Sequence, residues 1–228
     1  QNGIDLDKIA GPIWESASPE NFEKAARAYD KRKSGYGLTR QAWIACELLK
    51  LLWRGQNPKT VQLWRDLEDA AIEAVASPGK VTQIPNGKIK FRRAGSFLFC
   101  QLPSGRAIAY PYPRLVEKET PWGAKVPGIV YKGVDSLTKK WTDQQFYGGL
   151  SAENVTQGLC RDIMVEGMPG LELLGYSVVL TVHDEVVTYI KDGIGNLNEF
   201  TNKLTLPPAW CADMPISGEA WKGKRYRK

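Results

Sequence analysis

Histidine is nearly absent from this sequence. Its 228 residues include a single histidine, His183, and four cysteines that are scattered along the chain without any C-x-x-C pair. That spacing excludes the paired ligands of a zinc knuckle and gives no sign of a disulfide framework. We therefore expect reduced thiols in a cytoplasmic protein.

Long apolar runs are also missing. No hydrophobic run approaches the roughly 20 residues that a membrane-spanning helix needs. The first residues, QNGIDLDKIAG, lack the basic and then apolar pattern of a signal peptide. They also lack an initiator methionine, so we expect that the chain begins partway through a longer coding sequence or has been processed.

The remaining composition is that of a folded, basic protein. Hydrophobic residues make up 43% of the chain, which includes eight tryptophans, and this argues against disorder. The length is enough for one large domain or two small ones. The formal charge of +6 fits a polyanionic partner, although many basic proteins have none.

Capping signals and apolar spacing predict helices in residues 1–78. Ser18-Pro19 and Asn57-Pro58 each place a capping side chain before a proline, the typical start of a helix. A further helix is expected after Thr39, where leucines and isoleucine recur on one face.

Residues 79–145 change to a β-rich pattern. The segments GKIKFRR, SFLFCQL and RAIAYPYPRL are short, aromatic or β-branched, and separated by turn residues, so we expect antiparallel strands. The segment 116–138 is rich in Pro, Gly and Lys and is expected to be a loop with irregular pairing.

Residues 146–228 predict a helix, a hairpin and a second, short helix. The helix SAENVTQGLCRDIMVEGM carries an apolar stripe that should be buried. The runs YSVVLTV and EVVTYI predict two strands joined by a tight turn at His183-Asp184, and another helix is expected over 198–204. We expect the flanking valines to be buried while the turn projects from the end of the sheet.

The HDE tripeptide in this hairpin is a candidate metal site. Asp184 and Glu185 are neighbouring carboxylates, which repel each other unless a proton or a cation intervenes. Mg²⁺ suits an oxygen-rich site that also holds substrate phosphates. On spacing alone, an ordinary exposed hairpin turn explains the tripeptide about equally well.

An ordered series of segments resembles a known family. TVHDEVV, with the preceding YGGLSAENVTQGLCRDIM and GLELLGYSVVL, resembles the C-terminal palm of family A (polymerase-I-like) DNA polymerases, in particular their bacteriophage branch. The same branch fits RQAWIACELLKLLWRGQNPKTVQLWRDLEDAAIEAV, LPSGRAIAYPYPRL and MPISGEAWKGKRYRK in the same order. The resemblance covers nearly the whole chain. It implies an α+β fold with a palm-type antiparallel sheet bearing the HDE hairpin, packed by helices, and an N-terminal helical segment derived from the fingers.

The resemblance also implies roles for the residues of the HDE tripeptide. Asp184 would be a ligand of two catalytic Mg²⁺ ions, with Glu185 as a supporting acid, and His183 would contact the primer terminus. The implied partners are primer–template DNA and dNTP, in the cytoplasm of an infected bacterial host.

The same resemblance implies DNA contacts from the helix before the hairpin. Gln157 would reach the minor groove, where a side chain can test the shape of a base pair without reading its sequence. Asn154 and Arg161 would be its neighbours. Arg106 in LPSGR would hold a phosphate, or is simply a surface arginine beside a turn.

Two motifs of the family are missing from these residues. There is no D-x-S-x-I-E segment to supply the second catalytic aspartate, and no lysine and aromatic at the spacing of the nucleotide-binding fingers helix. We therefore expect a split enzyme, in which a second polypeptide supplies both motifs, and expect little activity from this chain alone. A truncated remnant is the competing explanation.

Two alternative functions also have to be compared with the sequence. The chain could be a non-catalytic DNA-binding or scaffolding protein that keeps the palm fold, because a fold does not by itself confer activity. A metal-dependent phosphohydrolase would need more ligand histidines than His183 alone, so the sequence argues against it.

Overall fold

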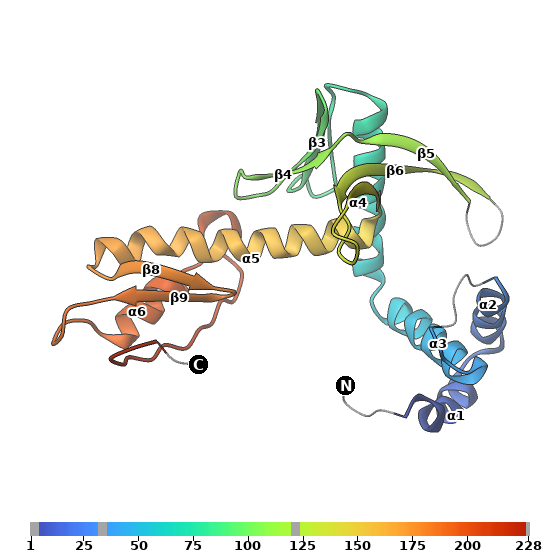
Figure 1. Cartoon of the computed structure of the whole chain (residues 1–228), viewed down its shortest axis with the longest axis horizontal. Helices are drawn as coiled ribbons and strands as arrows, with labels where there is room; N and C mark the ends of the chain where they lie inside the picture. The colour runs from blue at the N-terminus through green and yellow to red at the C-terminus, as the bar shows by residue number, and fades with distance from the viewer. Residues whose placement is uncertain (1–4, 32–35, 120–123, 227–228) are drawn as a thin grey trace.

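The computed structural model describes residues 5–31, 36–119 and 124–226. Figure 1 shows an extended molecule with the N-terminal helices at one end and a C-terminal lobe at the other. Helices α4 and α5 connect these ends, and two β-sheets lie beside them. Within the described residues, no helix is both long and apolar enough to cross a membrane.

The N-terminal part is helical, as predicted. Its helices are α1 (Leu6–Ser16), α2 (Pro19–Asp30), α3 (Arg40–Gln56) and α4 (Pro58–Ala76). Ser18 caps α2 by accepting from the amide of Asn21, and Thr39 caps α3 in the same way. The first three helices share a small core around Ile44 and Leu48. Helix α1 is not among the elements predicted from the sequence.

A four-stranded antiparallel sheet follows α4. Its strands are β1 (Val81–Gln83), β2 (Lys90–Ala94), β3 (Phe97–Gln101) and β4 (Ala107–Pro111), in that order. The three strands expected from the sequence are confirmed, and β1 is an addition. Alternate residues such as Phe91, Leu98 and Cys100 are fully buried in the core that the sheet shares with α4 and the start of α5.

The expectation of a loop over 116–138 is wrong for residues 116–119 and 125–134, which are strands, while residues 120–123 lie outside the described part of the chain. A second antiparallel sheet contains β5 (Arg114–Glu119), β6 (Lys125–Val134) and β7 (Trp141–Phe146). β7 pairs with residues 129–134 of β6, so Pro127 lies where β6 has β5 on one side only. A proline is tolerated on a sheet edge because its missing N–H is not needed there.

Helix α5 connects the sheets to the C-terminal lobe. The elements of this part are α5 (Gly148–Leu173), β8 (Ser177–Val182), β9 (Glu185–Tyr189), α6 (Leu197–Leu204) and the short 3-10 helix η1 (Ala209–Cys211). The start of α5 is placed against α4 by Gly148, whose amide donates to Glu68 at 3.0 Å. From there α5 runs out to the lobe, and β8 returns alongside it (Figure 1).

These elements confirm a mixed α+β fold with antiparallel sheets. α4 shares its core with the sheets, whereas α1 to α3 form a separate core. The division into residues 1–78, 79–145 and 146–228 stays a prediction.

Candidate functional site

The HDE tripeptide lies at the tip of the β8–β9 hairpin. Val182 pairs with Glu185, which leaves His183 and Asp184 as the two turn residues, and both are exposed. His183 has a φ of 52°, in the left-handed region that a tight turn requires. The strand–turn–strand prediction is confirmed. Because β8 runs back along α5, the turn points toward the central part of the chain (Figure 1).

The expectation that the flanking apolar residues are buried is wrong for the described chain. Val179 is 62% exposed and Leu180 is 49% exposed, and Val186 and Val187 are only partly covered. The physical reason is that β8 and β9 form a sheet of two strands that joins neither larger sheet. Of the helices, α5 contacts β8, and this contact leaves part of the hairpin exposed.

Glu185 is held by the C-terminal segment. The hydroxyl of Tyr226 donates to its carboxylate at 2.7 Å. This hydrogen bond, followed by burial, raises the pKa of Tyr226. The contact places Tyr226 beside the hairpin.

The hairpin brings two carboxylates together that could hold a metal ion. The carboxylates of Asp184 and Glu185 are the hard oxygen ligands that Mg²⁺ prefers. However, no group of three His, Cys, Asp or Glu residues in the described ranges could hold a metal ion. The residues present fit one side of a Mg²⁺ site, and the remaining ligands would have to come from elsewhere.

The predicted DNA-contacting residues of α5 lie on different sides of that helix. Asn154 is half-buried and donates to the hydroxyl of Tyr110 at 3.0 Å, so it joins α5 to the sheet. Burial raises the pKa of Tyr110. Gln157 and Arg161 are exposed, and Gln157 donates to Glu153 at 3.3 Å. Of these side chains, Gln157 and Arg161 are free to reach an external partner without breaking a core contact.

Arg106 is tied to α5. Its guanidinium donates to the carboxylate of Asp162 at 2.5 Å and to the carbonyl of Gly158 at 2.8 Å. The hydroxyl of Ser104 donates to the same carboxylate. A phosphate contact from Arg106 would therefore have to share a guanidinium that already joins the β3–β4 turn to α5.

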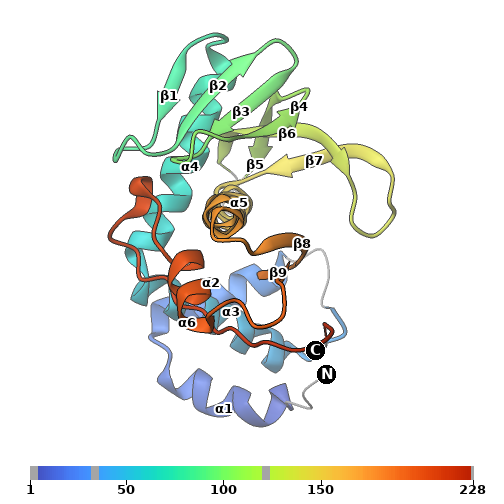
Figure 2. The ribbon, with the colours of Figure 1, turned by 90° about the vertical axis from the view of Figure 1, so that its left-hand side faces the viewer.

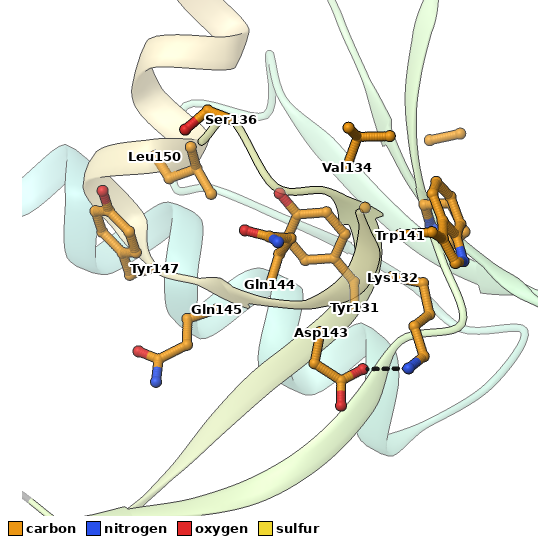
Figure 3. Close-up of a pocket in the computed structure, with 13 residues that line it drawn as sticks. Tyr131, Lys132, Val134, Ser136, Trp141, Asp143, Gln144, Gln145, Tyr147 and Leu150 are labelled. Atoms are coloured by element: carbon orange, nitrogen blue, oxygen red, sulfur yellow. Dashed lines mark ion pairs between the residues drawn. The ribbon is translucent and has the colours of Figure 1, made fainter. Parts of the chain in front are cut away.

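The sequence did not predict an open depression of about 790 Å³ beside the start of α5 (Figure 3). Tyr131, Trp141 and Tyr147 are among the side chains that line it. At its rim the ammonium of Lys132 lies 2.9 Å from the carboxylate of Asp143. The sequence contains the three aromatic residues, but only the pairing of β6 with β7 shows that their side chains line the same depression.

The rim of this depression is electrostatically balanced. Hydrogen bonds from Lys132 and then Arg114 hold the pKa of Asp143 below its usual range. Burial raises the pKa of Tyr131. The depression thus offers aromatic rings and amide groups rather than a free catalytic acid or base.

The chain is similar to a curated protein named DNA polymerase from Bacillus phage SP02. The two are 34% identical over 182 residues, which is 80% of this chain and 27% of the phage protein. The chain therefore matches about a quarter of that relative's length. No family model matches the chain, and no solved structure matches it.

Proposed function

We propose that this chain forms part of a template-directed DNA polymerase of family A type. The observation that carries the proposal is the placement of Asp184 at the exposed tip of a two-stranded hairpin, in a chain similar to a phage protein named DNA polymerase. A carboxylate in a two-residue turn projects from the end of its sheet, where a metal ion and further ligands can reach it.

In this proposal the HDE tripeptide serves nucleotidyl transfer. Asp184 and Glu185 hold Mg²⁺, and His183 contacts the primer terminus. A pair of Mg²⁺ ions would stabilise the attacking and leaving oxygens of the in-line displacement. Gln157 and Arg161 are exposed on α5 and face primer–template DNA. The dNTP is bound by the part of the enzyme that this chain does not contain.

The remaining groups would come from a second polypeptide. The proposal needs another carboxylate and a nucleotide-binding helix, and neither the sequence nor the described side chains provide them. Val179 and Leu180 of β8 are exposed apolar side chains, and a partner that covers them would remove this apolar surface from water. The site of action would be the cytoplasm of an infected bacterial host.

One observation favours a second function. The described residues lack a complete set of metal ligands, so the chain could hold DNA as a scaffold without taking part in catalysis. In that case Asp184 would be an ordinary turn residue, and its replacement would change nothing in synthesis.

Primer extension separates these functions. The assay uses the chain together with the polypeptide that co-purifies with it from its natural source. Asp184→Asn should lower the rate at least about 100-fold, because a metal ion contributes several kcal/mol of charge stabilisation. Asp192→Asn, another exposed aspartate of the same lobe, is the matched control and should leave the rate unchanged. An unchanged rate for Asp184→Asn would establish the scaffold, and robust synthesis by this chain alone would exclude the need for a partner.

A further inference from the structure

One long stretch of the chain is basic and contains no acidic residue. Residues 77–114 contain seven Lys and Arg residues and no Asp or Glu. Because the whole chain carries +6, the remaining residues together carry a net charge of −1. This stretch runs from the end of α4 through β1–β4 to the first residue of β5. Three of its cations pair with acids outside it, Lys80 with Glu73, Arg106 with Asp162 and Arg114 with Asp143, and the others form no ion pair within the described residues. A basic segment on one element is the electrostatic footprint of a polyanion-binding surface.

The strand register divides this sheet into two faces. Alternate residues point to opposite sides of a strand, and the side containing Phe91 and Leu98 is buried against α4 and α5. The opposite side is here called the platform face, and the register places on it Val81, Gln83, Lys90, Arg92, Ala94, Phe97, Phe99, Gln101, Ala107, Ala109 and Pro111. α4 lies behind the sheet in Figure 2, so the platform face is turned toward the viewer.

The platform face presents aromatic rings to solvent. Phe97 is 39% exposed, and the adjoining Tyr112 is 57% exposed. The ring of Phe97 lies 5.7 Å from that of Phe99 and 6.5 Å from that of Tyr112, measured between centroids. Such a row of rings on a solvated sheet is unfavourable unless a partner covers it. Bases of a single strand can cover it by stacking.

Cations lie beside these rings without opposing acids. Lys90 and Arg92 belong to the platform face, and neither forms an ion pair within the part of the chain that the structure describes. Arg92 and Phe99 are directly paired across β2 and β3. A base on Phe99 would therefore place its phosphate within reach of the guanidinium of Arg92.

The surface is hollowed and continues past β4. A depression of about 360 Å³ lies between Arg92, Phe99 and Ala107, where the small alanine leaves room above the strand. Ala109 and Pro111, on the β4 edge of the platform face, also line the larger depression that contains Trp141 and Tyr147. The aromatic surface thus extends from β3 across β4 to the start of α5.

We propose that the platform face and the adjoining depression bind a single-stranded nucleic acid. Unpaired bases stack on Phe97, Phe99 and Tyr112, while Lys90 and Arg92 neutralise phosphates. A duplex keeps its bases stacked inside and cannot use these rings. The proposal does not depend on Asp184, which lies in the C-terminal lobe.

Fluorescence anisotropy of the full chain tests the proposal. The probes are labelled 12-nucleotide oligo(dT) and oligo(U), with a blunt DNA duplex of the same length for comparison. Phe97→Ala and Phe99→Ala should each weaken single-strand binding about five-fold or more. Arg92→Gln should weaken it and lower the slope of log K against log salt by about 0.7. Tyr36→Ala and Lys59→Gln, an exposed aromatic and an exposed lysine outside the platform face, are the matched controls and should bind like the wild type.

Several outcomes decide the matter. Binding of either oligonucleotide that the platform variants weaken supports the proposal and identifies whether DNA or RNA is preferred. Absence of single-strand binding, a duplex affinity that the platform variants weaken equally, or platform variants that bind single strands like the controls would overturn it. Photocrosslinking of the wild type with a 5-iodouracil oligonucleotide needs no variant: adducts within residues 90–112 are expected, and adducts only on α5 or the β8–β9 hairpin would contradict the proposal.

Discussion

The guanidinium of Arg106 and the carboxylate of Asp162 lie 2.5 Å apart, although the two residues are 56 positions apart in the chain. Their ion pair joins the β3–β4 turn to the middle of α5. The side chain of Asp162 is only 10% exposed, and it also accepts from Ser104. This pair sets how the basic sheet sits on the helix that leads to the HDE hairpin.

Removing that carboxylate should destabilise the chain. Asp162→Ala leaves two donors without their acceptor, and we expect a loss of about 1.5–3 kcal/mol in the free energy of unfolding, the range for hydrogen bonds to charged groups. Glu23→Ala is the matched control, because Glu23 pairs with Arg27 but is 67% exposed. It should change the free energy by less than about 0.5 kcal/mol. Urea unfolding measures both, and equal effects would show that the Arg106–Asp162 pair contributes no more than an exposed pair.

The crossing of α4 and α5 requires a glycine at position 148. A Cβ there would lie 1.9 Å from the carbonyl oxygen of Trp64, which is backbone and cannot turn aside. Gly148→Ala should therefore cost about 2–3 kcal/mol or more. Gly55→Ala, in α3, meets nothing within 4 Å and should stabilise by up to about 1 kcal/mol through helix propensity. Thermal unfolding should move in opposite directions for the two variants, and a harmless Gly148→Ala would refute this close approach.

The sequence predicted the helices and strands whose signals are local. Ser18 followed by Pro19 marks the start of α2, and its hydroxyl makes the expected cap. Asn57 is instructive, because its side chain does not cap α4 and instead donates to the carbonyl of Trp53 at the end of α3. β6 was missed because its proline and glycines indicate a loop unless the edge position of Pro127 is known, and β5 was missed with it because the two strands pair with each other. Strand pairing joins residues that are far apart in the sequence, so a local sequence pattern does not reveal it.

The sequence predicted the hairpin turn of the candidate site but not the elements that surround it. Alternation of apolar residues around His183 and Asp184 was enough to place the hairpin and its tip. Burial of the hairpin was not, since it depends on what covers β8 and β9. Arg106 looked like a free surface cation, and only the fold reveals that Asp162 holds it.

Thiol reactivity should separate the cysteines by position. Cys100 is fully buried in β3, and burial raises the pKa of its thiol from 9.0 to about 12, whereas Cys160 is exposed on α5. At pH 8 a thiol reagent should modify Cys160 rapidly and Cys100 only when the chain unfolds. Mass spectrometry of the labelled peptides checks this order, and equal labelling of both under native conditions would contradict the packing of β3.

The same burial predicts a pH dependence. Between pH 9 and about 12 the Cys100 thiol is ionised in the unfolded chain but protonated in the folded one, so the folded state binds more protons. Its contribution to stability is complete below pH 9 and is lost as the pH rises toward the folded value. Cys100→Ala should flatten the fall in stability above pH 9 when compared with the wild type. An identical slope would show that other groups cause the fall.

The bare β8–β9 hairpin should be the least protected sheet in the isolated chain. A sheet of two strands is marginal by itself, and Val179 and Leu180 remain exposed on it. Amide hydrogen exchange should therefore be fast at β8 and β9 and slow at β2 and β3, whose inner face is buried. Adding the proposed partner polypeptide should slow exchange at the hairpin while leaving β2 and β3 unchanged. A hairpin already as protected as β3, or one that no partner protects, would contradict its role as an interface.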